Sequence, residues 1–372
     1  MGITTMMALV MLSITAFFGD EPQTTTTDAR GIYGGYPTSL VKPGASLPEA
    51  SGVNAIWVGS DSLDAARIQT FHDNGARVFA EFNTLHVADY IKDHPDAAPI
   101  GPDGKPSPPP DGWQGICPTH PEYRRARMEA FRKALATFNI DGIWLDYHHA
   151  HASWEQPEPN LTDTCFCARC LKAFDEFTGL GLSALPHRMA VHEIQEHLKE
   201  RWVEFRCGVL TDWIREFKAI RDETRPKALI GVFHCPWSSD ERDGALRKKL
   251  YIDLRAWKSY IDVYSPMPYH ARFGHANDLD WIARQTKWLG AFLEIQGTPG
   301  ERVKIWPIVQ ISKWGEDVDP SEIEKVVTLG AQPPSTGVMV FAWGGFANEA
   351  AKVEALTRAY RKMVEAERTP RN

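Results

Sequence analysis

Four of the six cysteines are spaced in a way that suits a metal ion. Cys165, Cys167 and Cys170 form a C-x-C-x2-C run, and Cys117 precedes them in the chain. Zinc prefers thiolates at tetrahedral angles, and close spacing lets one loop supply several of them. Disulfide bonds are the alternative, because an exported protein could form them. Three thiols this close cannot pair conveniently with one another, so the spacing favours a structural Zn²⁺ ion as cofactor.

Carboxyl groups lie at the ends of two apolar segments. Asp146 lies in GIWLDY at 142–147, and Glu81 lies in RVFAEF at 77–82. Hydrolysis of a glycosidic bond needs two carboxyl groups across that bond, one ionised and one protonated. We therefore predict Asp146 as the nucleophile and Glu81 as its catalytic partner. Other acidic residues, all in the loop 238–244, remain alternatives for the acid: Asp240, Glu241 and Asp243.

The strand pattern also predicts how these groups lie. Successive side chains of a strand point to opposite faces, which directs Asp146 to one face and Tyr147 to the other. Two carboxyl groups this close repel each other, so the pKa of one should rise. We expect Asp146 to stay ionised and Glu81 to carry the raised pKa.

Polar and aromatic side chains follow most of the apolar segments. A sugar site needs such a set, because hydroxyl groups require hydrogen-bonding partners and sugar faces pack on flat rings. The candidates for substrate contacts are Tyr36, His148, His234, Trp237, Tyr269, His270, Gln310 and Trp343.

The elements that must position these residues alternate between strand and helix. The predicted strands are 31–35, 55–60, 77–82, 142–147, 229–234, 262–269, 304–312 and 338–343. Alternation indicates a parallel sheet with helices outside it, and eight such units indicate a (β/α)8 TIM barrel, a single α/β domain with elaborated βα loops. Catalytic residues of such barrels lie at the carboxyl ends of the strands. An open doubly wound sheet is the alternative, but its glycine-rich phosphate turn is missing after the first strand.

Helical periodicity appears between these strands. The patterns predict helices over 63–74, over 119–138 and over a long region from 189 to 222, with a last helix at 348–365. Thr119 and Glu122 have the spacing of a capping box at the start of the second helix.

Composition and charge narrow the function classes. The chain has 372 residues and a net charge of −7, which argues against nucleic acid as a partner. The run Met6–Phe18 is apolar but too short to cross a bilayer, and it resembles a signal-peptide core or a frayed helix. We expect residues 1–19 to be a signal peptide, 20–28 a linker and 29–368 the catalytic barrel. The mature protein would then be secreted or periplasmic, otherwise cytoplasmic, with no membrane partner; the sequence leaves its oligomeric state open.

Three stretches resemble the glycoside hydrolase family 42 β-galactosidases. They are CPTHPEYR from Cys117, GIWLDY at 142–147 and CFCARCLKAF at 165–174, and the segment they span covers about 60 of 372 residues. In that family a lone cysteine and a C-x-C-x2-C run bind a structural zinc, so the resemblance implies the same role for the four cysteines. The catalytic pair departs from the family. Asp146 lies where the family has Asn-Glu, and Gln310 and Lys313 lie where its nucleophilic glutamate is expected.

A second resemblance concerns the nucleophile. Trp144-Leu145-Asp146 resembles the W-x-D strand end that carries the nucleophile of retaining α-glycosidases, such as α-fucosidases and α-galactosidases. DGIWLDY at 141–147 and DVYSPMPYH at 262–270 look like uncharacterised bacterial glycoside hydrolase barrels. The resemblance implies hydrolysis of an oligosaccharide or glycoside, with retention of configuration and a carbohydrate substrate. The alternative is a carbohydrate-binding barrel that has lost its activity, which the missing strand-7 glutamate supports. A metal-dependent barrel hydrolase would need His-x-His after the first strand, and 31–36 contains no histidine.

Overall fold

The parallel strands of the main sheet form a closed barrel in this computed structural model, which describes residues 27–368. The strands are β1 (Ala29–Tyr33), β2 (Ala55–Gly59), β3 (Arg77–Asn83), β4 (Gly142–Asp146), β7 (Leu229–His234), β8 (Val263–Pro266), β9 (Lys304–Ile305), β10 (Ile308–Gln310) and β11 (Gly337–Phe341). They pair in the order β10-β11-β1-β2-β3-β4-β7-β8-β9, and every pairing is parallel. The ends of that order, β9 and β10, are consecutive halves of one segment, so the barrel closes.

The predicted (β/α)8 barrel is confirmed. Each of the eight predicted segments contains a strand, and most strand ends fall within two residues of their predicted positions. The seventh segment is divided into β9 and β10 at Trp306-Pro307, because proline has no N–H to donate to a neighbouring strand.

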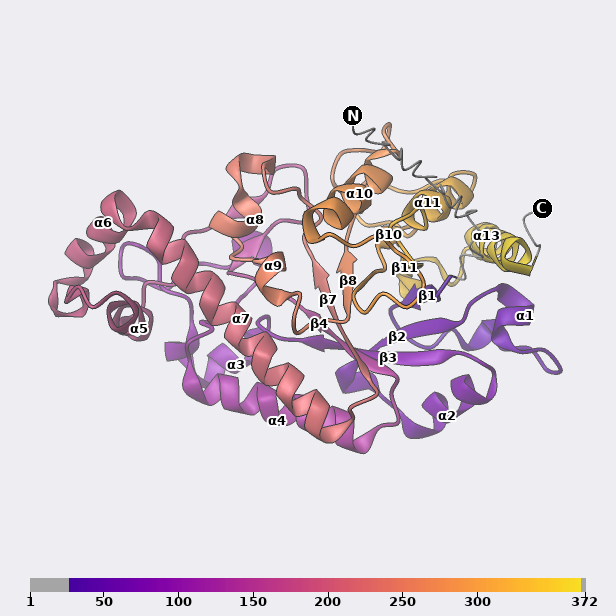
Figure 1. Cartoon of the computed structure of the whole chain (residues 1–372), viewed down its shortest axis with the longest axis horizontal. Helices are drawn as coiled ribbons and strands as arrows, with labels where there is room; N and C mark the ends of the chain where they lie inside the picture. The colour runs from indigo at the N-terminus through magenta and orange to yellow at the C-terminus, as the bar shows by residue number, and fades with distance from the viewer. Residues whose placement is uncertain (1–26, 369–372) are drawn as a thin grey trace, which may run out of the picture.

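Helices cover the outside of the barrel, as Figure 1 shows. The longer ones are α2 (Ala65–Asp73), α4 (Pro121–Thr137), α7 (Lys199–Thr224), α10 (Trp281–Leu293), α11 (Ile323–Gly330) and α13 (Ala350–Arg368). Shorter ones are α1 (Leu47–Ser51), α3 (Ala88–Asp93), α8 (Ala245–Lys248), α9 (Leu254–Trp257) and α12 (Trp343–Phe346). Two further helices, α5 (Ala168–Thr178) and α6 (His187–His197), project from the barrel at the left of Figure 1.

Two details of the helices differ from the prediction. The cap of α4 is His120, whose Nδ1 accepts the Tyr123 N–H at 3.2 Å, so the predicted capping box of Thr119 is wrong. The Thr119 hydroxyl lies 3.2 Å from the Cys117 sulfur instead. The long helical region is interrupted at Leu198, where α6 ends and α7 begins.

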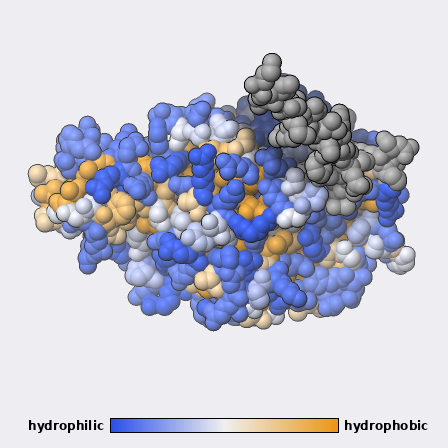
Figure 2. Space-filling view, viewed as in Figure 1, coloured by the Kyte–Doolittle hydropathy of each residue, from blue (hydrophilic) through white to orange (hydrophobic). Residues whose placement is uncertain are grey.

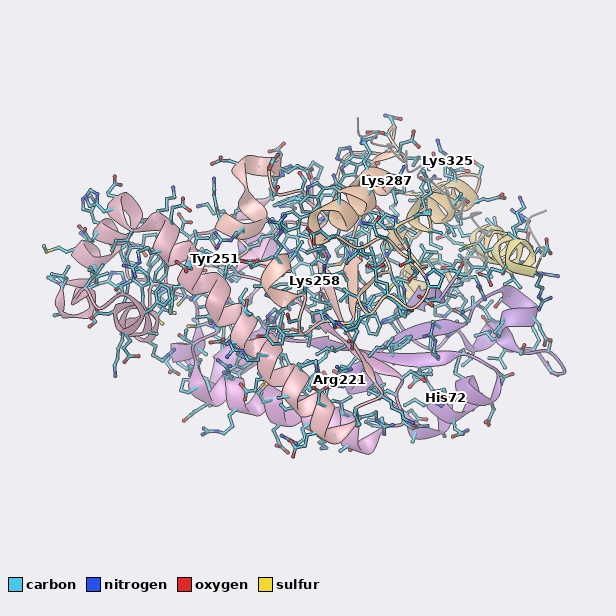
Figure 3. The ribbon with its side chains drawn as sticks, in the orientation of Figure 1. His72, Arg221, Tyr251, Lys258, Lys287 and Lys325 are labelled. Carbon is cyan, nitrogen blue, oxygen red and sulfur yellow. The ribbon has the colours of Figure 1, made fainter. Side chains whose placement is uncertain are left out.

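Two aspartates tie the strand starts to the helical layer. The Asp141 carboxylate, just before β4, accepts the Val78 N–H and contacts Nε2 of His72 on α2, each at 2.8 Å. Asp262, just before β8, accepts the Ile230 N–H at 3.0 Å and pairs with Arg221 of α7 at 2.9 Å. Figure 3 labels both helical side chains, His72 and Arg221. Each aspartate thus holds the amino-terminal ends of two neighbouring strands against a helix, β3 and β4 in one case and β7 and β8 in the other.

Large aromatic side chains fill the barrel. The rings of Trp57, Phe79, Trp144 and Trp306 contact one another with centroids 4.7–6.4 Å apart. We call these four residues the aromatic floor, because the residues at the carboxyl ends of the strands lie above them. Trp144 Nε1 donates to the Ser265 hydroxyl at 2.9 Å, so its buried N–H is satisfied. The floor is therefore a dry, closely packed layer beneath the barrel mouth.

The projection made by α5 and α6 has a small core of its own. Phe166 and Trp202 stack at 5.0 Å, and the four predicted zinc-binding cysteines are buried in the same cluster. Exposed apolar residues lie at its tip, including Leu180 and Met189, and Figure 2 shows hydrophobic surface at that end of the molecule.

The predicted signal peptide and most of the linker lie outside the described residues. No helix of residues 27–368 combines the length and apolar character needed to cross a bilayer. The predicted domain limits remain predictions.

We expect Gly231→Ala to destabilise the barrel. A Cβ at Gly231 of β7 would lie 2.1 Å from the Trp144 ring, so the aromatic floor would have to shift. Such overpacking costs about 1–3 kcal/mol of unfolding free energy. The matched control is Gly208→Ala on the exposed side of α7, where a Cβ meets nothing within 4 Å. It should stabilise the protein by up to about 1 kcal/mol. Urea unfolding measures both, and equal effects would contradict this description of the floor.

Candidate active site and cysteine cluster

Asp146 and Glu81 both face the interior of the barrel. Asp146 pairs with Asn83 in the register of β3 and β4, and Glu81 pairs with Trp144. Side chains two residues apart on a strand share a face, so Glu81 lies one step deeper than Asp146, level with the floor residue Trp144. The Asp146 side chain is almost enclosed, with the residue 7% exposed. Its Oδ1 accepts the Tyr147 N–H at 2.8 Å.

Burial and repulsion raise the pKa of both carboxyl groups. Burial raises the pKa of Asp146 well above its ordinary value, and the charges of Glu81 and Glu155 add to this effect. Burial also raises the pKa of Glu81, as does the charge of Asp61. A hydrogen bond from the Tyr33 hydroxyl and the nearby Arg127 guanidinium act in the opposite direction on Glu81.

This environment agrees with one of the two expected pKa values and contradicts the other. The raised pKa of Glu81 was predicted, whereas the raised pKa of Asp146 was not. Glu81 has a hydroxyl donor and a guanidinium that favour its charged form, whereas the Asp146 carboxyl group accepts the Tyr147 backbone N–H. A strand pattern does not show which carboxyl group has donors around it.

A third carboxyl group, Glu155, was missed by the sequence analysis. It lies in the turn of a short hairpin, between β5 (Ala152–Ser153) and β6 (Asn160–Leu161), in the loop after β4. Burial raises the pKa of Glu155 to about 7, while Arg272 lowers it. Only its place in the βα loop after Asp146 could have suggested it, because no motif marks the sequence Trp154-Glu155.

A small aromatic pocket, with room of about 30 Å³, lies beside these carboxyl groups. Its walls include Trp113, Tyr147 and Trp154, together with Glu155. Tyr147 adopts a left-handed backbone conformation with φ of 52°, which breaks the alternation of the strand. The expectation that Tyr147 points away from the site is therefore wrong. Its ring stacks on His86 at 4.9 Å and lies 5.5 Å from Trp113.

Three histidines line the same pocket and are held neutral. His149 Nε2 accepts the Trp154 N–H at 3.1 Å, and His151 Nδ1 accepts the Gly115 N–H at 2.9 Å. His86 Nε2 accepts the backbone N–H of Gln114 at 3.2 Å. Burial lowers the pKa of each of the three, that of His149 to about 4. Among the residues that line this pocket, Glu155 is the acidic one.

Several predicted substrate contacts lie away from the carboxyl groups. Both ring nitrogens of His148 have partners in the protein, the Leu210 carbonyl of α7 and the Thr84 hydroxyl. Tyr36 packs against Phe71 of α2, and its hydroxyl accepts the Asp64 N–H. His234 packs against Tyr264 at 5.9 Å, and Trp343 lies against Phe346.

Other predicted contacts lie nearer to the mouth. Tyr269 is close enough for the charges of Glu155 and Asp146 to raise its pKa. His270 is 0% exposed, and neither ring nitrogen has a hydrogen-bond partner among the described residues. Trp237 lies 6.5 Å from the pocket residue Trp154. These roles in substrate binding stay predictions.

The Gln310 side chain is hydrogen-bonded to backbone groups of the protein. Its Nε2 donates to the carbonyls of Ser312, Trp314 and Glu316 at 3.2–3.3 Å, and its Oε1 accepts the Arg272 N–H at 2.9 Å. The side chain therefore shapes the loops after β8 and β10 from a fully buried position.

The alternative acids of the loop 238–244 belong to a surface turn. Glu241 accepts the Ser238 N–H, and Asp240 accepts the Ser239 hydroxyl at 2.8 Å. Asp243 is exposed and pairs with Lys248 at 3.3 Å. None of these three raises the pKa of Asp146.

The four predicted zinc-binding cysteines meet in one buried cluster. The sulfurs of Cys117, Cys165, Cys167 and Cys170 all lie within 4.8 Å of one another. Cys117 Sγ is 3.6 Å from the sulfurs of Cys167 and Cys170, well beyond the length of a disulfide bond, about 2.05 Å. Neighbouring strands β3 and β4 place their loops side by side, which brings the lone cysteine to the other three.

The surroundings of the cluster suit a metal held by thiolates. Arg206 of α7, 2% exposed, donates from Nη1 to Cys170 Sγ at 3.2 Å. The Ile100 N–H donates to Cys165 Sγ at 3.3 Å. A buried guanidinium beside four sulfurs needs negative charge to compensate it, and thiolates bound to a divalent metal carry that charge. The four residues can therefore hold a metal ion.

The comparisons with known proteins bear on the fold. No family model and no curated protein sequence matches the chain. The glycoside hydrolase domain of PgaB (BpsB) from Bordetella bronchiseptica is similar in structure, with a TM-score of 0.64 at 12% identity over 89% of this chain and 98% of that one. A GH42 β-galactosidase from G. stearothermophilus has a TM-score of 0.58 at 13% identity, over 92% of this chain and 58% of that one.

A third similar structure is the α-L-fucosidase isoenzyme 2 from Paenibacillus thiaminolyticus. Its TM-score is 0.57 at 14% identity, over 90% of this chain. The chain spans 49% of that protein and 58% of the G. stearothermophilus enzyme, so it corresponds to part of each. These similarities confirm the TIM barrel, the fold that both resemblances in the sequence imply.

Proposed function

We propose that the protein is a glycoside hydrolase that acts on an oligosaccharide or glycoside. The observation that carries this proposal is the set of carboxyl groups in the mouth of the barrel, Asp146, Glu81 and Glu155, whose pKa values are raised by burial. Carboxyl groups with perturbed pKa values in a cleft mark acid–base chemistry. The aromatic pocket beside them supplies flat rings for a sugar face.

Asp146 is the nucleophile in this proposal. One of its oxygens forms a bond to the anomeric carbon while the bond from that carbon to the glycosidic oxygen breaks, and the leaving oxygen takes a proton from an acid. A water molecule then replaces the carboxylate at the same carbon, which gives retention of configuration. Because the anomeric carbon becomes positive as this happens, the transition state favours the ionised form of Asp146.

Glu81 supports Asp146 from one step deeper in the barrel. Burial raises the pKa of both carboxyl groups, and the charge of Glu81 raises the pKa of Asp146 further. Glu81 was predicted as the acid, but the Tyr33 hydroxyl and Arg127 favour its ionised form. We therefore assign Glu81 to the control of charge around the nucleophile.

A carbohydrate-binding barrel without activity is the second candidate. Gln310 favours this candidate, because it occupies the strand-7 position where a family 42 enzyme is expected to carry its nucleophile. The Gln310 side-chain amide is hydrogen-bonded to backbone groups. The two functions differ in turnover, which the next experiment measures.

We expect the protein to hydrolyse at least one member of a panel of aryl glycosides and oligosaccharides. Asp146→Asn should lower kcat/KM on that substrate by about 10³-fold or more, because the nucleophile is lost while the shape is kept. Asp89→Asn on α3, an exposed carboxylate, is the matched control and should change kcat/KM by less than about twofold. Binding of sugars without turnover by the unaltered protein would favour the binding barrel.

We also propose that the cysteine cluster holds a structural Zn²⁺ ion. Cys117, Cys165, Cys167 and Cys170 would bind it, which leaves no open position for water and gives the ion a purely structural role. It would join the loops after β3 and β4, the two loops that supply the aromatic pocket.

Purified protein should contain about one zinc ion per chain, as measured by elemental analysis. Cys167→Ser should remove the zinc and lower the unfolding temperature by about 5 °C or more, because a thiolate ligand is lost. Cys207→Ser, which alters a buried thiol outside the cluster, should keep the zinc. Full stability of a metal-free protein, or a disulfide between cluster cysteines, would be incompatible with the zinc site.

A further inference from the structure

Glu155 occupies a position that the proposed mechanism has not yet used. Its neighbour Trp154 and the loop residues Trp113 and Tyr147 form the aromatic pocket, and Glu155 lies in the wall of that pocket. Glu155 is also near enough to Asp146 for its charge to raise the pKa of that group. It therefore belongs both to the pocket wall and to the surroundings of the proposed nucleophile.

The backbone of Glu155 is held from a loop whose strand lies two places from β4 in the sheet. Arg272 Nε, in the loop after β8, donates to the Glu155 carbonyl. Arg272 is itself held by the Gln310 Oε1 at 2.9 Å, and its guanidinium lies over the Trp314 ring at 5.3 Å. This chain of contacts from Gln310 through Arg272 gives a loop residue a defined place in the mouth.

The carboxyl group of Glu155, in contrast, is free to act. No residue of the described range 27–368 donates a hydrogen bond to it, although its backbone is held. Glu155 is partly exposed and lines the aromatic pocket, so its carboxyl group can meet a ligand there. Burial also raises the pKa of Glu155 to about 7, so the carboxyl group can both hold and release a proton near neutrality.

We propose that Glu155 is the acid–base residue of the reaction, and that the aromatic pocket is the subsite for the leaving group. This inference rests on the proposed function. In the first step the Glu155 O–H gives its proton to the glycosidic oxygen while Asp146 bonds to the anomeric carbon. In the second step the Glu155 carboxylate takes a proton from the water that displaces Asp146. The sum of the two steps is the addition of one water molecule across the glycosidic bond.

Glu81 is less suited to this role. It lies one step deeper along β3, level with the floor residue Trp144, and it accepts the Tyr33 hydroxyl. A proton donor must reach the glycosidic oxygen of the leaving group. In this proposal the leaving group lies in the aromatic pocket, and Glu155 and Tyr147 belong to the wall of that pocket.

The test compares leaving groups. Phenyl, 4-nitrophenyl and 2,4-dinitrophenyl glycosides of the sugar that the unaltered protein hydrolyses best are given to Glu155→Gln. The kcat on the phenyl glycoside, whose leaving group needs a proton, should fall about 10²–10⁴-fold. The dinitrophenyl glycoside, whose leaving group departs without one, should lose less than about tenfold in formation of the glycosyl-enzyme. Azide should restore turnover of the dinitrophenyl substrate by Glu155→Ala and give a glycosyl azide.

The controls separate the possible outcomes. Glu158→Gln, an exposed carboxylate in the same loop, should behave as the unaltered protein. Asp146→Asn should lose activity on all three substrates, as the proposed function requires.

Equal losses of Glu155→Gln on all three substrates, or no loss, would overturn the assignment while leaving the proposed function in place. A leaving-group-dependent loss in Glu81→Gln alone would assign the acid to Glu81. No turnover by the unaltered protein would overturn both.

Discussion

Removal of carboxyl groups from water at the mouth of the barrel is the constraint on which the site depends. Asp146 and Glu81 stand on a floor of packed aromatic rings, where water cannot stabilise two negative charges. The register of β3 with β4 sets the two groups one step apart on the same inner face. The Tyr33 hydroxyl and the Arg127 guanidinium favour the charged form of Glu81.

The loops after β3 and β4 complete the site, and their stability comes from contacts outside the barrel. The cysteine cluster joins the two loops, and Arg206 connects the cluster to α7. Gln310, at the end of β10, and Arg272, in the loop after β8, hold the loop that carries Glu155. The rigid barrel thus supplies the inward-facing Asp146, while loops held at both sides supply the pocket. This division is usual for TIM barrels, in which function varies through the βα loops.

The sequence predicted what periodicity and spacing control. Strand order, the inward position of Asp146 and the meeting of Cys117 with the later cysteines all follow from alternation and barrel topology. The sequence did not predict features that depend on a single backbone angle or on a partner far away in the chain. Tyr147 turns into the pocket because its φ is positive, and no pattern marks that angle. Glu155 was missed because its place depends on Arg272, which is 117 residues away. The raised pKa of Asp146 was not predicted, because the burial that causes it depends on residues from other elements.

The pH dependence of stability of Asp146→Asn tests the central claim most directly. A carboxyl group whose pKa is raised in the folded state makes the protein less stable as pH rises above about 4, where the unfolded chain loses its proton. Asparagine cannot titrate, so the variant should match the unaltered protein near pH 4 and exceed its unfolding free energy by at least about 1 kcal/mol at pH 7. Asp262→Asn, which breaks the ion pair with Arg221, should destabilise instead. A variant that is less stable than the unaltered protein at pH 7, or a difference that does not change with pH, would contradict the account.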